Sequence, residues 1–248
     1  MQPQIVVPDT GFHNRDVDGS AKRLEDAKTY QDLSTVIICP TRGLIPAKVV
    51  QSWMGLIRPM NQKVLGPLFA IGMEVGDAYN SMFEMVVNHP EFSKWKYILT
   101  IEEDNMPPPD GLMKLYENMD KFDVIQGLYW TKGESGQPMI YGAVDVMPKN
   151  FIPQKPIANT LQACNGLGMG FNLFKISMFQ KIPKPWFKTI QQYTPGQGTA
   201  MYTQDLYFYE RAAKEGFKFA CDNRILVGHY DYINDMCWGN KVLQSKFR

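Results

Sequence analysis

The chain has 248 residues, of which 44% are apolar and 12% aromatic. This composition excludes intrinsic disorder, and the length suits one large α/β domain or two small ones. The 26 Lys and Arg residues nearly balance the 25 Asp and Glu residues, for a net charge of +1. The balance argues against affinity that comes mainly from general attraction to phosphate polymers or anionic lipid.

No segment predicts membrane insertion or export. The apolar stretches Thr35–Cys39 and Val64–Met73 are far shorter than the roughly 18–20 residues of a transmembrane helix. Met1–Pro8 lacks the basic-then-apolar order of a secretory signal. The cysteines form no C-x-x-C pair, so we expect buried or free thiols in a soluble, cytoplasmic protein. These cysteines are Cys39, Cys164, Cys221 and Cys237.

The first half of the chain alternates strands and helices. Residues 1–33 are polar and then helix-compatible from Ala21 to Tyr30, which predicts an extension outside the main domain. The β-branched run Thr35–Cys39 lacks alternation, as expected for a strand covered on both faces. Next we expect a helix at Ala47–Leu56, an apolar stretch at Val64–Ile71, a helix at Glu74–Asn88, a strand at Tyr97–Ile101, a helix from Asp110 and a strand at Asp123–Leu128. This order predicts a parallel sheet with crossover helices.

The second half predicts strands of mixed direction. We expect strands at Pro138–Val146 and Leu161–Phe174, a short helix at Lys175–Lys181, a mobile loop at Gln191–Thr203, a helix at Asp205–Glu215, and strands at Phe217–Cys221 and Ile225–Val227. No linker separates the two halves. The prediction is therefore one α/β domain over residues 34–232, with a mixed central sheet flanked by helices and a tail over residues 233–248.

Three consecutive acids, Glu102-Glu103-Asp104, follow the strand Tyr97–Ile101. Ligands of open α/β sheets bind beyond the carboxyl ends of strands. Three carboxylates at that position repel one another, and a hard divalent cation such as Mg²⁺ or Mn²⁺ would supply the counter-charge. The alternative interpretation is a solvated acidic turn that caps the next helix.

Two later segments carry further candidate groups. Asp205 stands where a helix should begin, so plain N-capping is the alternative to a chemical role. His229 follows a short strand directly after Gly228, and a structural histidine is the alternative to a metal ligand. Each signal is weak alone, but their order along the chain is informative.

That order resembles the GT-A glycosyltransferases, especially the family 2-like group, over residues 34–232. A strand precedes Pro40-Thr41-Arg42-Gly43, a second precedes the acidic triplet, and a glycine-rich strand, a helix-start Asp and a Gly-His follow. The resemblance implies the GT-A fold, a Rossmann-like fold of nucleotide-diphospho-sugar transferases. It also implies transfer of a sugar from a nucleoside-diphosphate sugar to a hydroxyl acceptor, with Mn²⁺ or Mg²⁺ as cofactor.

The resemblance assigns roles residue by residue. Glu102-Glu103-Asp104 matches the D-x-D motif, in which Asp104 binds the metal and the two glutamates contact the nucleotide sugar. His229 matches a late histidine that completes the metal shell in some members. Asp205 matches the residue that often serves as general base in inverting members. The other positions implied to bind the nucleotide sugar are Pro40, Thr41, Arg42, Gly168 and Gly170.

Several alternatives stay open. Glu replaces Asp at two motif positions, and Gln204 replaces the usual Glu before Asp205. A nucleotidyltransferase would usually have a longer glycine-rich loop than Pro40–Gly43, and a non-catalytic nucleotide-sugar-binding module should lack the metal set. The late histidine leaves inversion or retention open. The acceptor is equally open: a saccharide, a protein, a lipid-linked or small molecule, or a modified DNA base.

Other segments are candidates for substrate contact. The glycine-hinged segment Gln191–Thr203 is a candidate lid over the donor, with a plain surface loop as the alternative. Four aromatic side chains are candidates for stacking on a sugar or a base, with core packing as the alternative. They are Trp130, Trp186, Tyr193 and Trp238.

Overall fold

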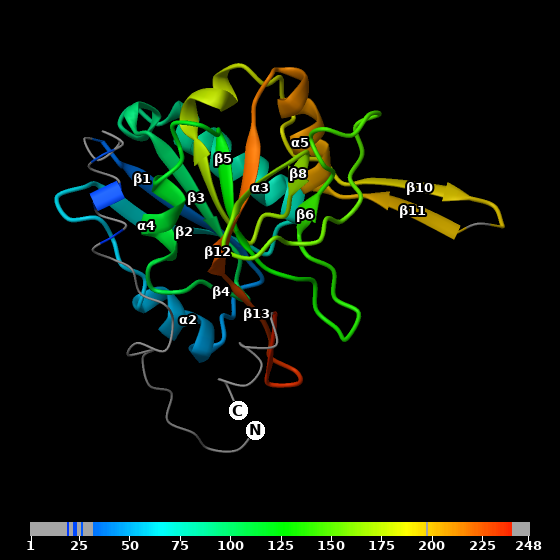
Figure 1. Ribbon diagram of the computed structural model, residues 1–248, viewed down its shortest axis with the longest axis horizontal. Helices are drawn as coiled ribbons and strands as arrows, with labels where there is room; N and C mark the ends of the chain where they lie inside the picture. The colour runs from blue at the N-terminus through cyan, green and yellow to red at the C-terminus, as the bar shows by residue number, and fades with distance from the viewer. Residues whose placement is uncertain (1–18, 20–21, 24–25, 27–31, 197, 240–248) are drawn as a thin grey trace.

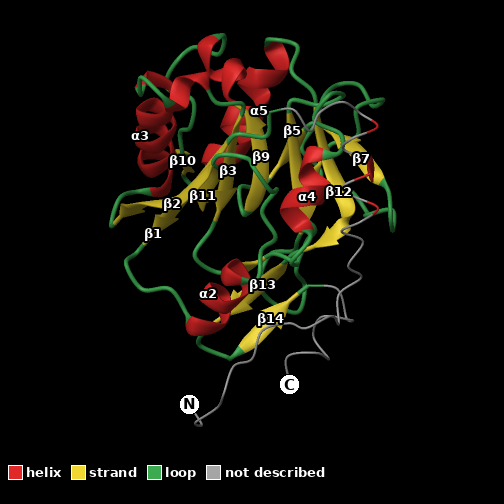
Figure 2. Ribbon diagram, turned by 90° about the vertical axis from the view of Figure 1, so that its left-hand side faces the viewer, coloured by secondary structure: helices red, strands yellow, loops and turns green. Residues whose placement is uncertain are grey.

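The computed structural model describes residues 19, 22–23, 26, 32–196 and 198–239 (Figure 1). The helix expected at residues 21–30 therefore lies largely outside the described residues. The tail expected at residues 233–248 lies partly outside them. The described chain is built on one large sheet with helices on both faces, and a smaller sheet lies below it (Figure 2).

The central sheet has seven strands in the order β2-β1-β3-β9-β5-β12-β7. Their bounds are β1 Thr35–Thr41, β2 Val64–Ile71, β3 Tyr97–Ile101, β5 Val124–Leu128, β7 Leu161–Cys164, β9 Phe171–Lys175 and β12 Phe219–Leu226. β1 is parallel to β2 and β3, and β5 is parallel to β12, whereas β9 runs antiparallel between β3 and β5. The expected α/β fold with a mixed central sheet is confirmed.

Both faces of this sheet are covered, which explains the unbroken apolar runs of its strands. Val36 and Ile38 of β1 join a core on one face, and Ile37 and Cys39 join a second core on the other. The helices α3 and α5 pack on the first core, and α4 packs on the second. The helices are α2 Ala47–Met54, α3 Val75–Asn88, α4 Gly111–Tyr116 and α5 Gln204–Lys214, with 3-10 turns at Phe92–Lys94 and Ile176–Gln180.

A three-stranded sheet, in the order β14-β13-β4, lies at the carboxyl edge of the central sheet. It consists of β4 Asn105–Met106, β13 Gly228–Asp231 and β14 Met236–Trp238. His229 pairs with Asn105 on one side and with Trp238 on the other. This register places His229 beside the segment that directly follows the acidic triplet.

Residues 191–203 form no open loop, so that expectation is wrong. They form most of an antiparallel hairpin of β10 Ile190–Thr194 and β11 Gly198–Tyr202, which projects from the body of the molecule (Figure 1). Gly196, with φ +80°, lies in the connecting turn. Glycine and proline thus mark a hairpin turn here, and cross-strand pairing orders the flanking residues.

Other boundaries also differ from the prediction. The strand expected at 161–174 is three elements, β7, β8 Gly166–Leu167 and β9, and the strand expected at 138–146 shrinks to β6 Ile140–Tyr141. The two strands expected between 217 and 227 form the single strand β12. Sequence patterns do not show where a chain leaves one sheet to pair with another, because the partners are remote in sequence.

All four cysteines are buried free thiols. Among the described residues, no helix has the length and apolar character needed to cross a membrane.

Candidate active site at the carboxyl edge of the sheet

The acidic triplet lies in a tight turn, and each of its carboxylates has a different set of partners. The Glu102 N–H donates to the Gly170 carbonyl at 3.1 Å, and the Asn105 N–H donates to the Glu102 carbonyl at 3.0 Å. The turn separates the three side chains. The alternative of a simple solvated turn is therefore wrong for these acids, because Glu103 is 8% exposed and Asp104 has a side chain 19% exposed.

Glu103 connects β3 to the loop that follows β1. Its carboxylate accepts hydrogen bonds from Thr41 Oγ1 at 2.7 Å, from the Arg42 N–H at 2.8 Å and from Arg42 Nε at 2.5 Å. Burial acts to raise the pKa of Glu103, but these bonds outweigh it and leave the pKa lowered. The Arg42 side chain remains 73% exposed. Pro40, Thr41 and Arg42 are thus held at the sheet edge beside the acidic turn.

Glu102 points into the protein. Tyr79 of α3 donates its hydroxyl hydrogen to Glu102 Oε1 at 2.9 Å. Burial, together with the nearby Asp104 carboxylate, raises the pKa of Glu102 to about 7. His229 acts electrostatically to lower the pKa of Glu102, and Asp205 acts to raise it.

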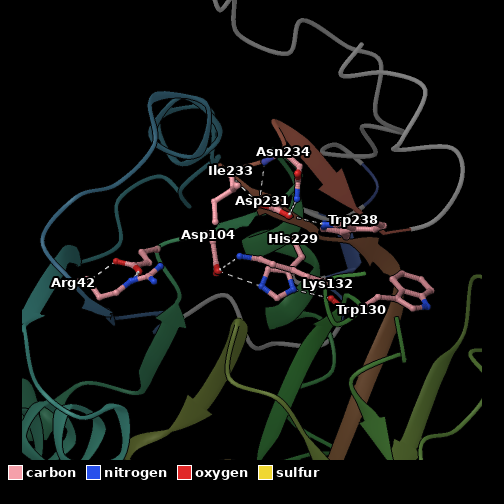
Figure 3. Close-up of polar contacts among 10 residues, drawn as sticks. Arg42, Asp104, Trp130, Lys132, His229, Asp231, Ile233, Asn234 and Trp238 are labelled. Carbon is pink, nitrogen blue, oxygen red and sulfur yellow. Dashed lines mark hydrogen bonds and ion pairs between the residues drawn. The ribbon is translucent and has the colours of Figure 1, made fainter. Parts of the chain in front are cut away.

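Asp104 is the centre of a charged cluster with Lys132 and His229 (Figure 3). Lys132 Nζ lies 2.6 Å from Asp104 Oδ2, and His229 Nε2 lies 3.3 Å from the same oxygen. Burial acts to raise the pKa of Asp104, but His229 and Lys132 outweigh it and lower the pKa to about 2. Asp104 is therefore a carboxylate at every physiological pH.

The orientation of His229 is set by the backbone. His229 Nδ1 lies 2.8 Å from the Trp130 carbonyl oxygen. A carbonyl oxygen can only accept, so Nδ1 carries the hydrogen and Nε2 faces Asp104. Nε2 of His229 and Nζ of Lys132 thus meet at the same oxygen of Asp104.

Asp104 and His229 are the residues that would hold a divalent metal ion at this edge. Their Oδ2 and Nε2 atoms lie 3.3 Å apart, and carboxylate oxygen and imidazole nitrogen are both donors to such ions. A metal-bound histidine usually donates its other ring N–H to a carbonyl or carboxylate, as His229 does to Trp130. Within the described residues, no group of three or more His, Cys, Asp or Glu side chains is arranged to hold a metal ion, so Asp104 and His229 would be its two protein ligands. The remaining ligands would come from substrate and water.

Asp205 lies in the first turn of α5, and the N-cap residue is Thr203. The helix therefore begins one residue before Asp205, the predicted first residue. Its Oδ1 accepts from the Leu206 N–H at 2.9 Å and from the Thr203 hydroxyl. Burial raises the pKa of Asp205 despite these bonds. A carboxyl group of raised pKa suits proton transfer near neutral pH.

Gly168 and Gly170 have a packing role that the sequence pattern did not show. A Cβ atom at Gly168 would collide with the Tyr129 hydroxyl, and one at Gly170 would lie 2.6 Å from Asn105 Oδ1. The Gly170 N–H donates to the Tyr129 hydroxyl at 2.9 Å. Contact with a donor sugar stays a prediction for both glycines.

Sequence reasoning missed two residues of this site, Tyr79 and Lys132, and it considered Trp130 only for stacking by its ring. Tyr79 is a core residue of α3, Trp130 acts through its backbone carbonyl, and Lys132 follows the end of β5. Only Lys132 could have been found from the sequence. It follows the predicted strand at residues 123–128, and the carboxyl ends of parallel strands meet at one sheet edge. Of the aromatic candidates, Trp186 is 1% exposed and belongs to the core, whereas Tyr193 is 71% exposed.

Comparison with known proteins shows likeness at the level of fold. No family model matches the sequence, and no curated protein matches it. Among solved structures, A197 from STIV is 18% identical with a TM-score of 0.57, over 80% of this chain and 86% of that one. The chain thus shares its fold with A197.

Two further solved structures have lower scores. Residues 1–349 of TarS from S. aureus are 10% identical with a TM-score of 0.41, over 76% of this chain and 57% of that one. A putative UDP-N-acetylglucosamine pyrophosphorylase from Entamoeba histolytica is 11% identical with a TM-score of 0.40, over 88% and 79%. The chain is an α/β protein with a mixed central sheet flanked by helices.

Proposed function

We propose that this protein is a metal-dependent glycosyltransferase that moves a sugar from a nucleoside-diphosphate sugar to a hydroxyl acceptor. The observation that carries the proposal is the approach of His229 Nε2 to Asp104 Oδ2, with His229 Nδ1 committed to the Trp130 carbonyl. This pair lies at the carboxyl edge of the sheet, where α/β folds bind their ligands.

Asp104 and His229, together with the nearby cations Lys132 and Arg42, suit the binding of a diphosphate. Asp104 and His229 would hold Mn²⁺ or Mg²⁺, which when bound supplies positive charge for the diphosphate leaving group. Lys132, whose side chain is 32% exposed beside Asp104, offers a second cation to the same oxygens. Arg42, held by Glu103 with its side chain exposed, would contact the nucleotide.

Asp205 is proposed as the general base of an inverting transfer. Its carboxylate would accept the proton of the acceptor hydroxyl while the acceptor oxygen bonds to the anomeric carbon. The bond from that carbon to the diphosphate breaks in the same step, and the electron pair leaves with the diphosphate. The raised pKa of Asp205 supports this role, because a general base works best when its pKa lies near the operating pH.

A screen of nucleotide sugars by thermal shift, with and without Mn²⁺, tests the proposal. Ligands that bind the native state raise its apparent stability. We expect a nucleotide sugar to raise the melting temperature only with Mn²⁺, and the Asp104→Asn variant to lose this effect. Metal-dependent release of the free sugar in the absence of acceptor would add support. Release of pyrophosphate from a nucleoside triphosphate and a sugar phosphate would favour a nucleotidyltransferase instead.

A further inference from the structure

A pocket of about 410 Å³ lies beside the two candidate metal ligands, Asp104 and His229, on the side away from Arg42 (Figure 3). It lies between the turn that follows β5 and the end of β14, and Figure 3 shows the rings of Trp130 and Trp238 together on this side of His229. Its volume falls in the range of about 300–1,000 Å³ that is typical of small-molecule sites. The remaining lining residues are Thr131, Gly133, Glu134, Gly136, Met236 and Gly239.

Both tryptophans are anchored to the metal-ligand candidate His229. Trp130 accepts the His229 Nδ1 hydrogen at its carbonyl, 2.8 Å away, and Trp238 faces His229 across the β13–β14 pair. The Trp238 indole N–H also lies 3.5 Å from Asp231 Oδ2. The same contacts that orient the histidine therefore position the walls of the pocket.

The lining chemistry suits a saccharide ring. Indole faces pack against the C–H groups of a pyranose, and the indole N–H leaves a polar edge for its hydroxyls. The carboxylate of Glu134 can accept hydrogen bonds from those hydroxyls. Among the described residues that line the pocket there is no Lys or Arg, and Glu134 is the one charged residue of this lining.

We propose that this pocket binds a saccharide ring of the acceptor. The inference rests on the proposed glycosyl transfer, with the nucleotide on the Arg42 side of Asp104 and the acceptor on the tryptophan side. Among the acceptor classes that the sequence leaves open, the two indoles and one carboxylate favour a saccharide.

Direct binding tests the pocket without requiring catalysis. The full chain is titrated with methyl glycosides of glucose, galactose, mannose and N-acetylglucosamine, both anomers of each, with and without Mn²⁺ and UDP. Intrinsic tryptophan fluorescence reports binding, because Trp130 and Trp238 are two of the five tryptophans. We expect at least one glycoside to bind, with affinity about tenfold weaker in Trp238→Ala. Glu134→Gln should also weaken it.

Trp95→Phe is the matched control, because Trp95 packs near Phe92, away from the pocket. It should leave the affinity for the glycoside unchanged. Equal affinity of Trp238→Ala and the natural protein would overturn the assignment, as would the absence of binding for every glycoside in both conditions. Glycoside binding together with a failed nucleotide-sugar screen would contradict the proposed transfer and leave the pocket as a saccharide site.

Discussion

His229 Nε2 lies 3.3 Å from Asp104 Oδ2, although the two residues belong to segments far apart in the sequence. The short pair β4–β13 brings them together, because His229 faces Asn105 directly after Asp104. The pair is therefore a product of backbone register, and the Trp130 carbonyl then fixes which ring nitrogen faces the carboxylate.

Loss of either member of this pair should remove metal-dependent ligand binding. Asp104→Asn and His229→Ala should each abolish the Mn²⁺-dependent thermal shift with a nucleotide sugar and reduce turnover by about 100-fold or more. Asp120→Asn, at an exposed acid after α4, is the control and should behave as the natural protein. Undiminished turnover in Asp104→Asn would remove the metal role.

Substitution of the proposed base should separate chemistry from donor binding. Asp205→Asn is expected to lower kcat by about 10²- to 10⁴-fold and to keep the Mn²⁺-dependent thermal shift. The base must be ionised, and the pKa of Asp205 is raised by burial. Activity of the natural protein should therefore rise with pH through a pKa above the ordinary range of aspartate. A kinetic pH profile checks this, and full activity of Asp205→Asn would exclude the role.

Glu102 should make the metal-free protein less stable as pH rises. Its pKa is about 7 in the folded state against 4.5 for an ordinary glutamate, so the unfolded state loses its proton first. The stabilising contribution of the protonated group is complete below 4.5 and is lost as pH rises toward 7, by about 3 kcal/mol in total. Urea unfolding across this window should show the loss.

The Glu102→Gln variant should lack this part of the pH dependence and be more stable than the natural protein above pH 7. Glu103→Gln is the contrasting variant. The pKa of Glu103 is lowered in the folded state, so its contribution is present at neutral pH and is lost on acidification. Parallel pH dependence in Glu102→Gln and the natural protein would contradict the assignment for Glu102.

A buried ion network away from the site should be important for stability. The Glu117 side chain is 2% exposed and contacts Arg23 at 3.0 Å and Arg224 at 2.8 Å. The two guanidinium groups are 41% and 26% exposed, and Arg224 also contacts Asp222, so loss of the Glu117 charge leaves them partly solvated and partly paired. Hydrogen bonds to charged groups contribute about 1.5–3 kcal/mol each, and Glu117→Gln should lower the free energy of unfolding by an amount of this order. Denaturant titration measures the loss.

The matched control for Glu117→Gln is Glu210→Gln, which breaks the exposed pair with Lys214 on α5. Exposed pairs at this helical spacing contribute only about 0.3–0.5 kcal/mol. A similar loss for both variants would show that burial does not set the cost at Glu117.

The sequence by itself determined the strands β1, β2, β3 and β5 of the sheet and the position of the acids. Thr35–Thr41 and Tyr97–Ile101 are apolar or β-branched without alternation, because both faces of each strand are covered. The sequence alone therefore predicts that the triplet after β3 lies at a sheet edge.

Only the tertiary structure decided what each acid contacts. Glu103 meets Arg42, Glu102 meets Tyr79, and Asp104 meets Lys132 and His229, and none of these pairs is local in the chain. Local patterns report the burial and geometry of one element at a time. Partners across strands and turns depend on register and on how β4 and β13 pair, which is set by the packing of the whole chain.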